Sequence, residues 1–84
     1  MQLVKLMQII EVIQKTPGVC GGYACVRQTR IPVWTLVSLR QQGATEQELL
    51  SNYPGLTLED LTAVWGYYYN HKSEIDRNIV EMED

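Results

Sequence analysis

Two arginines flank a Gln-Thr pair in the stretch VRQTRIPV, residues 26–33 of this 84-residue chain. An arginine guanidinium is a planar fork that binds phosphate or carboxylate groups, and a threonine hydroxyl can bond to a phosphate backbone. Arg27, Thr29 and Arg30 can therefore contact nucleic-acid phosphates, the carboxylates of a partner or of this chain, or backbone carbonyls that tether the loop. The residue types alone leave all three interpretations open.

The charge of the chain is divided unequally between its two halves. Residues 1–40 hold five Lys and Arg residues against one Glu, a net charge of +4, whereas residues 41–84 hold two against nine acidic residues, a net charge of −7. The acidic half repels phosphate backbones, while the basic segment, which includes Arg40, can meet either nucleic acid or an acidic protein surface.

Few residues have the types and spacing that catalysis or metal binding needs. His71 lies one helical turn before Glu74, but no nucleophile or glycine-rich loop accompanies this pair. Two cysteines and one histidine cannot supply the four ligands of a structural zinc site. The sequence therefore predicts no enzyme activity, no cofactor and no metal. Cys20 and Cys25 are expected to be reduced thiols, although their spacing does not exclude a strained disulfide.

The apolar N-terminal stretch, MQLVKLMQIIEVI, is interrupted by Gln2, Lys5, Gln8 and Glu11 before it reaches the length of a membrane span. We therefore expect a cytoplasmic protein without membrane contact. A single domain over 1–84 is small for a self-sufficient core, so a homo-oligomer is expected, with dimerisation through residues 3–13 as one route.

The first third of the chain favours a short β element. Residues 3–13 fit helical spacing as well, but β-branched residues favour a strand over 9–14, and residues 23–27 can form its partner. Pro17-Gly18 and Gly21-Gly22 predict turns between the two.

The remaining residues predict helices. One starts near Val33, after Pro32, and ends at Gly43. Capping boxes then open a short helix and a longer one, and a serine is placed to cap a last helix. The capping residues are Thr45 with Glu48, Thr57 with Asp60, and Ser73.

Apolar and aromatic residues mark the faces of the last two helices. The helix over 57–69 presents one stripe and the last helix another, with Tyr67 or Tyr69 left for an interface because the aromatic residues surround the helix. The stripes are Leu58, Leu61, Val64, Trp65 and Tyr68, and then Ile75, Ile79 and Met82. The fold class expected is mainly α: a trihelical bundle of the helix-turn-helix type with a short N-terminal β element and an extra C-terminal helix.

Three blocks of sequence carry a resemblance that covers about residues 9–70. They are PGVCGG at 17–22, RQTRIPV at 27–33 and YPGLTLEDL at 53–61. Their order and spacing resemble the family known as domain of unknown function 433. That resemblance implies a homeodomain-like fold and the antitoxin half of a bacterial toxin-antitoxin pair. It also implies a PIN-type, ribonuclease-like toxin as the partner, and repression of the antitoxin's own operon.

This chain departs from the family pattern at two positions. Gln28 stands where the family has a glycine between arginine and threonine, and Ala24 stands where it has a proline. If that glycine serves a turn with positive φ, Gln28 must adopt a costly conformation or the turn must differ.

The leading hypothesis is an antitoxin-like protein that binds and neutralises a PIN-type toxin. Its acidic C-terminal helix could mimic nucleic acid against a basic nuclease surface. The alternatives are a sequence-specific DNA-binding regulator and a structural, homodimerising subunit. Glu59 and Asp60 weaken the DNA hypothesis, because they open the helix that would enter a major groove. The residues expected at partner or nucleic-acid contacts are Arg27, Thr29, Arg30, Arg40, Tyr67, Tyr69, Glu74 and Asp76.

Overall fold

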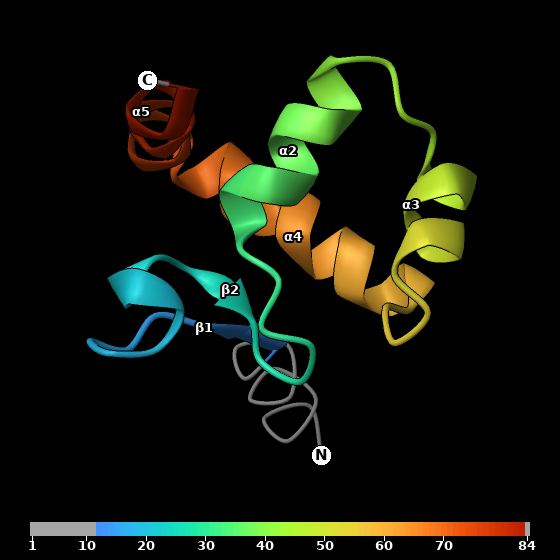
Figure 1. Cartoon of the computed structure of the whole chain (residues 1–84), viewed down its shortest axis with the longest axis horizontal. Helices are drawn as coiled ribbons and strands as arrows, with labels where there is room; N and C mark the ends of the chain where they lie inside the picture. Colours follow the sequence, from blue (N-terminus) through green and yellow to red (C-terminus); the bar gives the residue numbers. More distant parts are fainter. Residues whose placement is uncertain (1–11, 84) are drawn as a thin grey trace.

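The computed structural model describes residues 12–83, in which a short antiparallel hairpin precedes four α-helices (Figure 1). The predicted mainly α fold, with a β element near the N-terminus and an extra C-terminal helix, is confirmed. The elements in chain order are β1 (Ile13–Gln14), a 3₁₀ turn η1 (Cys20–Gly22), β2 (Cys25–Val26), α2 (Val33–Gln41), α3 (Glu46–Asn52), α4 (Leu58–Asn70) and α5 (Lys72–Glu83).

The hairpin is shorter than predicted. Ile13 pairs with Val26 and Gln14 with Cys25, so each strand has only two residues. The strand predicted over 9–14 is thus present at its end, and residues 9–11, with most of the 3–13 segment, lie outside the described residues. The hairpin continues into the loop that leads to α2, because Val26 N–H donates to Ile31 O at 2.9 Å.

The helix ends follow the local signals in the sequence. Gly43 has φ +108°, and the amides of Gly43 and Ala44 donate to Arg40 O and Leu39 O, both at 3.1 Å, which closes α2 as a Schellman motif. Both predicted capping boxes are present, at Thr45 before α3 and at Thr57 before α4. Each box satisfies two backbone donors that a helix start otherwise leaves unpaired.

Three details of the last two helices differ from the prediction. Ser73 does not cap α5, because α4 ends at Asn70 and α5 starts at Lys72, so that Ile75 N–H already donates to His71 O. Leu58 is 56% exposed because it occupies the first position of α4, before the buried stripe begins. Met82 is 44% exposed, one turn beyond the part of α5 that packs on the core.

The core lies where α2 packs against both α4 and α5, with the hairpin covering one end (Figure 1). Its fully buried centre consists of Val26, Val33, Leu36, Leu49, Leu61, Val64 and Ile75. In the part of the chain that the structure describes, no helix combines the length and the apolar character needed to cross a membrane.

Candidate functional site

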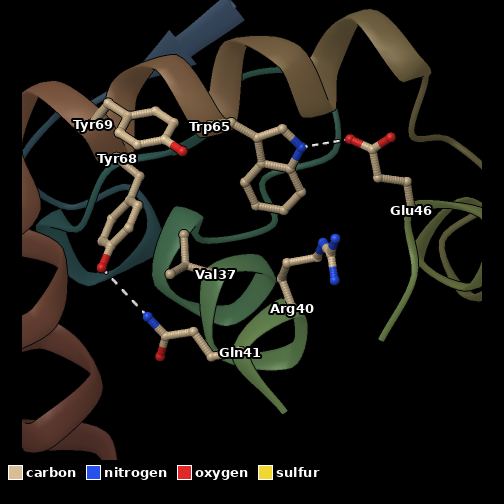
Figure 2. Close-up of a pocket in the computed structure, with 7 residues that line it drawn as sticks. All are labelled: Val37, Arg40, Gln41, Glu46, Trp65, Tyr68 and Tyr69. Carbon is tan, nitrogen blue, oxygen red and sulfur yellow. Dashed lines mark hydrogen bonds between the residues drawn. The ribbon is translucent and has the colours of Figure 1, made fainter. Parts of the chain in front are cut away.

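A groove of about 470 Å³ opens between α2 and α4, and the first residue of α3 closes one end of it. In Figure 2 the side chains of α2 and α4 face each other across this groove. The residues that line it are Val37, Arg40, Gln41, Glu46, Trp65, Tyr68 and Tyr69.

Helical spacing places these side chains on facing surfaces. Trp65, Tyr68 and Tyr69 stand at positions i, i+3 and i+4 of α4, and Val37 and Gln41 stand one turn apart on α2. Trp65 and Tyr68 are half-buried and pack against the core, whereas Tyr69 is 72% exposed. The groove therefore combines an aromatic floor with one aromatic ring that is open to a partner.

The carboxylates next to the groove are already bonded to its aromatic side chains. Trp65 Nε1 donates to Glu46 Oε2 at 2.7 Å, and the Tyr68 hydroxyl donates to Asp76 Oδ1 at 2.8 Å. Gln41 Nε2 in turn donates to the Tyr68 hydroxyl at 3.3 Å. The hydrogen bond to Asp76 is the main reason why the pKa of Tyr68 is raised above its usual value. These bonds fix the aromatic rings, and each engages one oxygen of a nearby carboxylate.

The positive charge of the groove is less engaged. Arg40 Nη1 donates to Ala44 O at 3.2 Å, and Lys72 Nζ lies 5.4 Å from the centroid of the Tyr69 ring. Within residues 12–83 an ion pair joins Lys15 to Glu74, and neither Arg40 nor Lys72 forms an ion pair with a carboxylate there. The groove is thus an aromatic surface with an arginine at its edge that forms no ion pair within residues 12–83.

The other predicted basic residues lie in a different place. Arg27 lines a second hollow, of about 550 Å³, between the hairpin and the start of α4. Glu59 and Asp60 line the same hollow, which brings the basic loop next to the acidic first turn of α4. This placement suits the interpretation in which the loop meets the chain's own acidic half.

The loop that carries Arg27, Thr29 and Arg30 is shaped by Arg30 and not by Gln28. Arg30 has φ +58°, Gln28 has no positive φ, and Arg30 N–H donates to Val26 O at 2.6 Å. The turn therefore differs from one with a left-handed residue at position 28. Thr29 is half-buried: its hydroxyl accepts from Ile31 N–H at 3.4 Å.

Tyr67, Glu74 and Asp76 were predicted at a partner contact, and all three make internal contacts. The Tyr67 hydroxyl donates to Glu74 Oε1 at 3.1 Å, and its ring stacks on His71 with centroids 4.0 Å apart. Burial, followed by the charge of Glu74, raises the pKa of Tyr67 to about 12. These contacts join α4 to α5, on which both acids lie.

Sequence reasoning placed Arg40 and Tyr69 at a contact but did not bring them together. It also missed Val37, Gln41 and Glu46 as lining residues, and treated Trp65 and Tyr68 only as core. The i, i+3, i+4 spacing on α4 was the available signal, whereas nothing local indicates that Glu46 lies opposite Trp65. Among the described residues, no cluster of three or more His, Cys, Asp or Glu side chains could hold a metal ion.

The fold and the groove define a small helical bundle that presents an aromatic groove with one arginine and one glutamate in its lining. Comparison with protein families identifies residues 13–68 as a match to the protein family of unknown function DUF433, and the chain belongs to that family. The crystal structure of a DUF433 member from Anabaena variabilis is similar to it, with 59% sequence identity and a TM-score of 0.82, over 94% of this chain and 79% of that one. No curated protein matches the chain.

Proposed function

We propose that this protein is a cytoplasmic, antitoxin-like binding module that uses the groove between α2 and α4 to bind and neutralise a PIN-type, ribonuclease-like toxin. The observation that carries the proposal is that an exposed tyrosine, Tyr69, and Arg40, which forms no ion pair within residues 12–83, line the same groove at the edge of an aromatic floor. Tyrosine, tryptophan and arginine are the residues that most often dominate the binding energy of protein interfaces.

The charge of the groove favours a particular kind of partner segment. Glu46 accepts a hydrogen bond from the Trp65 indole, and Asp76 accepts one from the Tyr68 hydroxyl. Arg40 and Lys72 form no ion pair with a carboxylate within residues 12–83. A segment with an apolar side chain for the aromatic floor and a carboxylate for Arg40 would satisfy both requirements. The proposed contact is therefore with an acidic and apolar segment of the toxin.

The acidic face of α5 is a weaker candidate for this contact. Glu74 lies 3.0 Å from Lys15 and accepts from Tyr67, and Asp76 accepts from Tyr68. These two carboxylates already act within the chain, which leaves Glu81 and Glu83 as exposed acids on that helix. A mimic of nucleic acid would have fewer free charges than the sequence indicates.

The first experiment is a tagged pull-down of the full chain from its host, with and without nuclease treatment, followed by mass spectrometry. We expect a stoichiometric partner that resembles a small ribonuclease, that survives nuclease and that is inhibited when the two purified proteins are mixed. A partner that binds without being inhibited would contradict the neutralising function.

The purified partner then allows the groove itself to be tested. Arg40→Glu should weaken the affinity by tenfold or more, about 1.4 kcal/mol, because it puts a negative charge opposite the proposed carboxylate. Arg77→Glu is the matched control, since it makes the same change of charge at an exposed position of α5 outside the groove. Equal effects of the two variants would show that net charge alone governs binding and would remove the groove from the proposal.

DNA is the competing ligand, and the exposed residues Arg27 and Arg30 are its best anchors. The same pull-down separates the two ligands, because DNA binding would yield no protein partner once nuclease is added. It would also give an affinity for the promoter that falls steeply with salt and that weakens in the Arg27→Ala, Arg30→Ala double variant. If the antitoxin-toxin complex regulates the operon, we expect a nuclease-resistant protein partner and also a salt-dependent affinity for the promoter.

A further inference from the structure

The two cysteines converge on one short segment of the loop before α2. Cys25, in β2, forms a β-bridge with Pro32, and the Cys20 thiol donates to Arg30 O with Sγ and O 3.2 Å apart. Because Arg30 and Pro32 are two positions apart, the same segment holds both cysteines. Cys20 also contributes to the electrostatic environment of the Cys25 thiol, and both cysteines are free thiols.

The two thiols differ in accessibility. Cys25 is 0% exposed, whereas Cys20 is half-buried and open to small reagents. Burial and then the neighbouring Cys20 raise the pKa of the Cys25 thiol to about 12, and the charge of Arg30 opposes part of this rise. Such a pair has one thiol that can react with a disulfide from solution and a second thiol that is shielded but nearby.

The backbone is strained at both residues of the hydrogen bond between the Cys20 thiol and Arg30 O. Cys20 has φ +54° and Arg30 has φ +58°, and these are the two non-glycine residues with positive φ in the described chain. The hydrogen bond from the Cys20 thiol to Arg30 O joins them. The left-handed region is unfavourable for non-glycine residues, so the bond helps to hold a conformation that the local sequence disfavours.

We propose that Cys20 and Cys25 form a reversible modification site, at which a small disulfide such as glutathione disulfide converts the two thiols into an intramolecular disulfide. The Cys20 thiolate attacks one sulfur of glutathione disulfide, which breaks that S–S bond and releases one glutathione thiolate. Cys25 then loses its proton and attacks Cys20 Sγ in the mixed disulfide, which releases the second glutathione. The protein loses two protons and two electrons, and glutathione disulfide is reduced to two glutathione molecules.

Oxidation would alter the basic loop and leave the groove in place. Once Cys20 Sγ is part of a disulfide it carries no hydrogen, so it can no longer donate to Arg30 O. Arg30 then loses one of the contacts that hold its left-handed conformation. The residues lining the groove all come from α2, α3 and α4, and the site is therefore independent of the function proposed for the groove.

The test uses the reduced, full chain incubated with glutathione disulfide at about pH 8, where accessible thiols are partly ionised. Intact mass and thiol counting under denaturing conditions are the measurements. We expect both thiols to disappear, the mass to fall by two hydrogens without bound glutathione, and dithiothreitol to reverse the change. A stable glutathione adduct with Cys25 still free, a disulfide-linked dimer, or two unreacted thiols would each overturn the proposal.

Two variants and one spectroscopic measurement sharpen this test. Cys25→Ser should trap glutathione on Cys20, and Cys20→Ser should leave the buried Cys25 unreacted. Rapid modification of Cys25 in the Cys20→Ser chain would show that Cys25 does not need Cys20, which contradicts the proposed order of attack. In the wild-type chain, the Cβ resonances of both cysteines should shift together with the amide resonances of Arg30 and Ile31, and resonances of the groove residues should not move.

Discussion

The two hollows beside α4 each hold an arginine and at least one carboxylate, and they differ in how these charges are balanced. At the start of the helix, Arg27 shares its hollow with Glu59 and Asp60. In the groove further along, the carboxylate of Glu46 is bonded to Trp65, and Arg40 has no acidic partner within residues 12–83. The groove holds one arginine and one carboxylate, whereas the loop hollow holds one arginine and two carboxylates. Acidic charge therefore exceeds basic charge in the loop hollow but not in the groove.

This difference explains why a basic residue can have a structural role in one hollow and a binding role in the other. An arginine that meets acids of its own chain offers little to a partner, since the partner would have to displace an existing interaction. An arginine whose neighbouring carboxylate is occupied by an indole remains available. In the proposed function Arg40 contacts the partner, and the Trp65–Glu46 hydrogen bond is the first contact to test by mutation.

The largest effect is expected for Trp65→Phe, which keeps an aromatic ring on the floor of the groove but removes the indole donor. The lost bond to a charged acceptor and the smaller ring should together lower the free energy of unfolding by about 2 kcal/mol, measured by chemical denaturation. Glu46 would then be free to turn toward Arg40, which lines the same groove. We expect affinity for the partner to fall as well, because the groove would balance its own charge.

A double variant separates the loss of stability from the change in charge. Trp65→Phe combined with Glu46→Gln removes both the donor and the freed carboxylate, so partner affinity should recover although the lost stability does not. If affinity stays low in the double variant, the aromatic surface of Trp65 is what the partner needs, and Glu46 has no influence on Arg40.

The two hollows also differ in how far the sequence could predict them. The C-terminus of α2 and the N-termini of α3 and α4 were predictable, because a Schellman motif or a capping box involves residues within about one turn of each other. The contacts that build the groove are not local: Trp65 is 19 positions from Glu46, and Tyr68 is 27 positions from Gln41. Such pairs depend on how α2, α3 and α4 pack, and no spacing pattern within one helix indicates them.

The loop before α2 shows the same limit in another form. The glycine of the family pattern directed attention to Gln28, yet the residue with positive φ is Arg30, two positions later. The tight hydrogen bonds between Val26 and residues 30 and 31 place the left-handed residue at the end of the turn. The resemblance indicated a strained turn in this block, and only the backbone geometry shows which residue has the strain.

A smaller effect tests this assignment in the loop before α2. Arg30→Val should lower the free energy of unfolding by about 1 kcal/mol, because a β-branched side chain is least compatible with positive φ. Arg30→Gly should leave stability unchanged or raise it slightly, since relief of strain offsets the entropy of glycine in the unfolded chain. Thermal or chemical denaturation of both variants is the measurement.

The matching glycine variant at Gln28 completes this test, because it is not expected to relieve any strain. Gln28 has no positive φ, so Gln28→Gly should not stabilise the protein, although it restores the residue of the family pattern. A clear stabilisation by Gln28→Gly, together with destabilisation by Arg30→Gly, would mean that the left-handed residue of the turn is at position 28.

The smallest effect is confined to alkaline pH and compares two neighbouring tyrosines of α4. Burial raises the pKa of Tyr67 to about 12, from 10.0, so the folded protein keeps this proton where the unfolded chain releases it. The free energy of unfolding must therefore fall as the pH rises from about 10 to about 12. Tyr67→Phe should remove part of this fall, measured by denaturation at a series of pH values.

Tyr68→Phe should remove less, because burial is only a secondary cause of the raised pKa of Tyr68, after its hydrogen bond to Asp76, and the hydrogen bond from Gln41 opposes the rise. The pKa of Cys25 is raised from 9.0 to about 12, so the free energy of unfolding begins to fall near pH 9. Neither phenylalanine variant should change the pH at which this fall begins. Equal effects of the two variants would contradict the difference in burial between these tyrosines. The groove side of α4 would then be as closed as the side that packs against α5, and Tyr68 would be a poor floor for a partner.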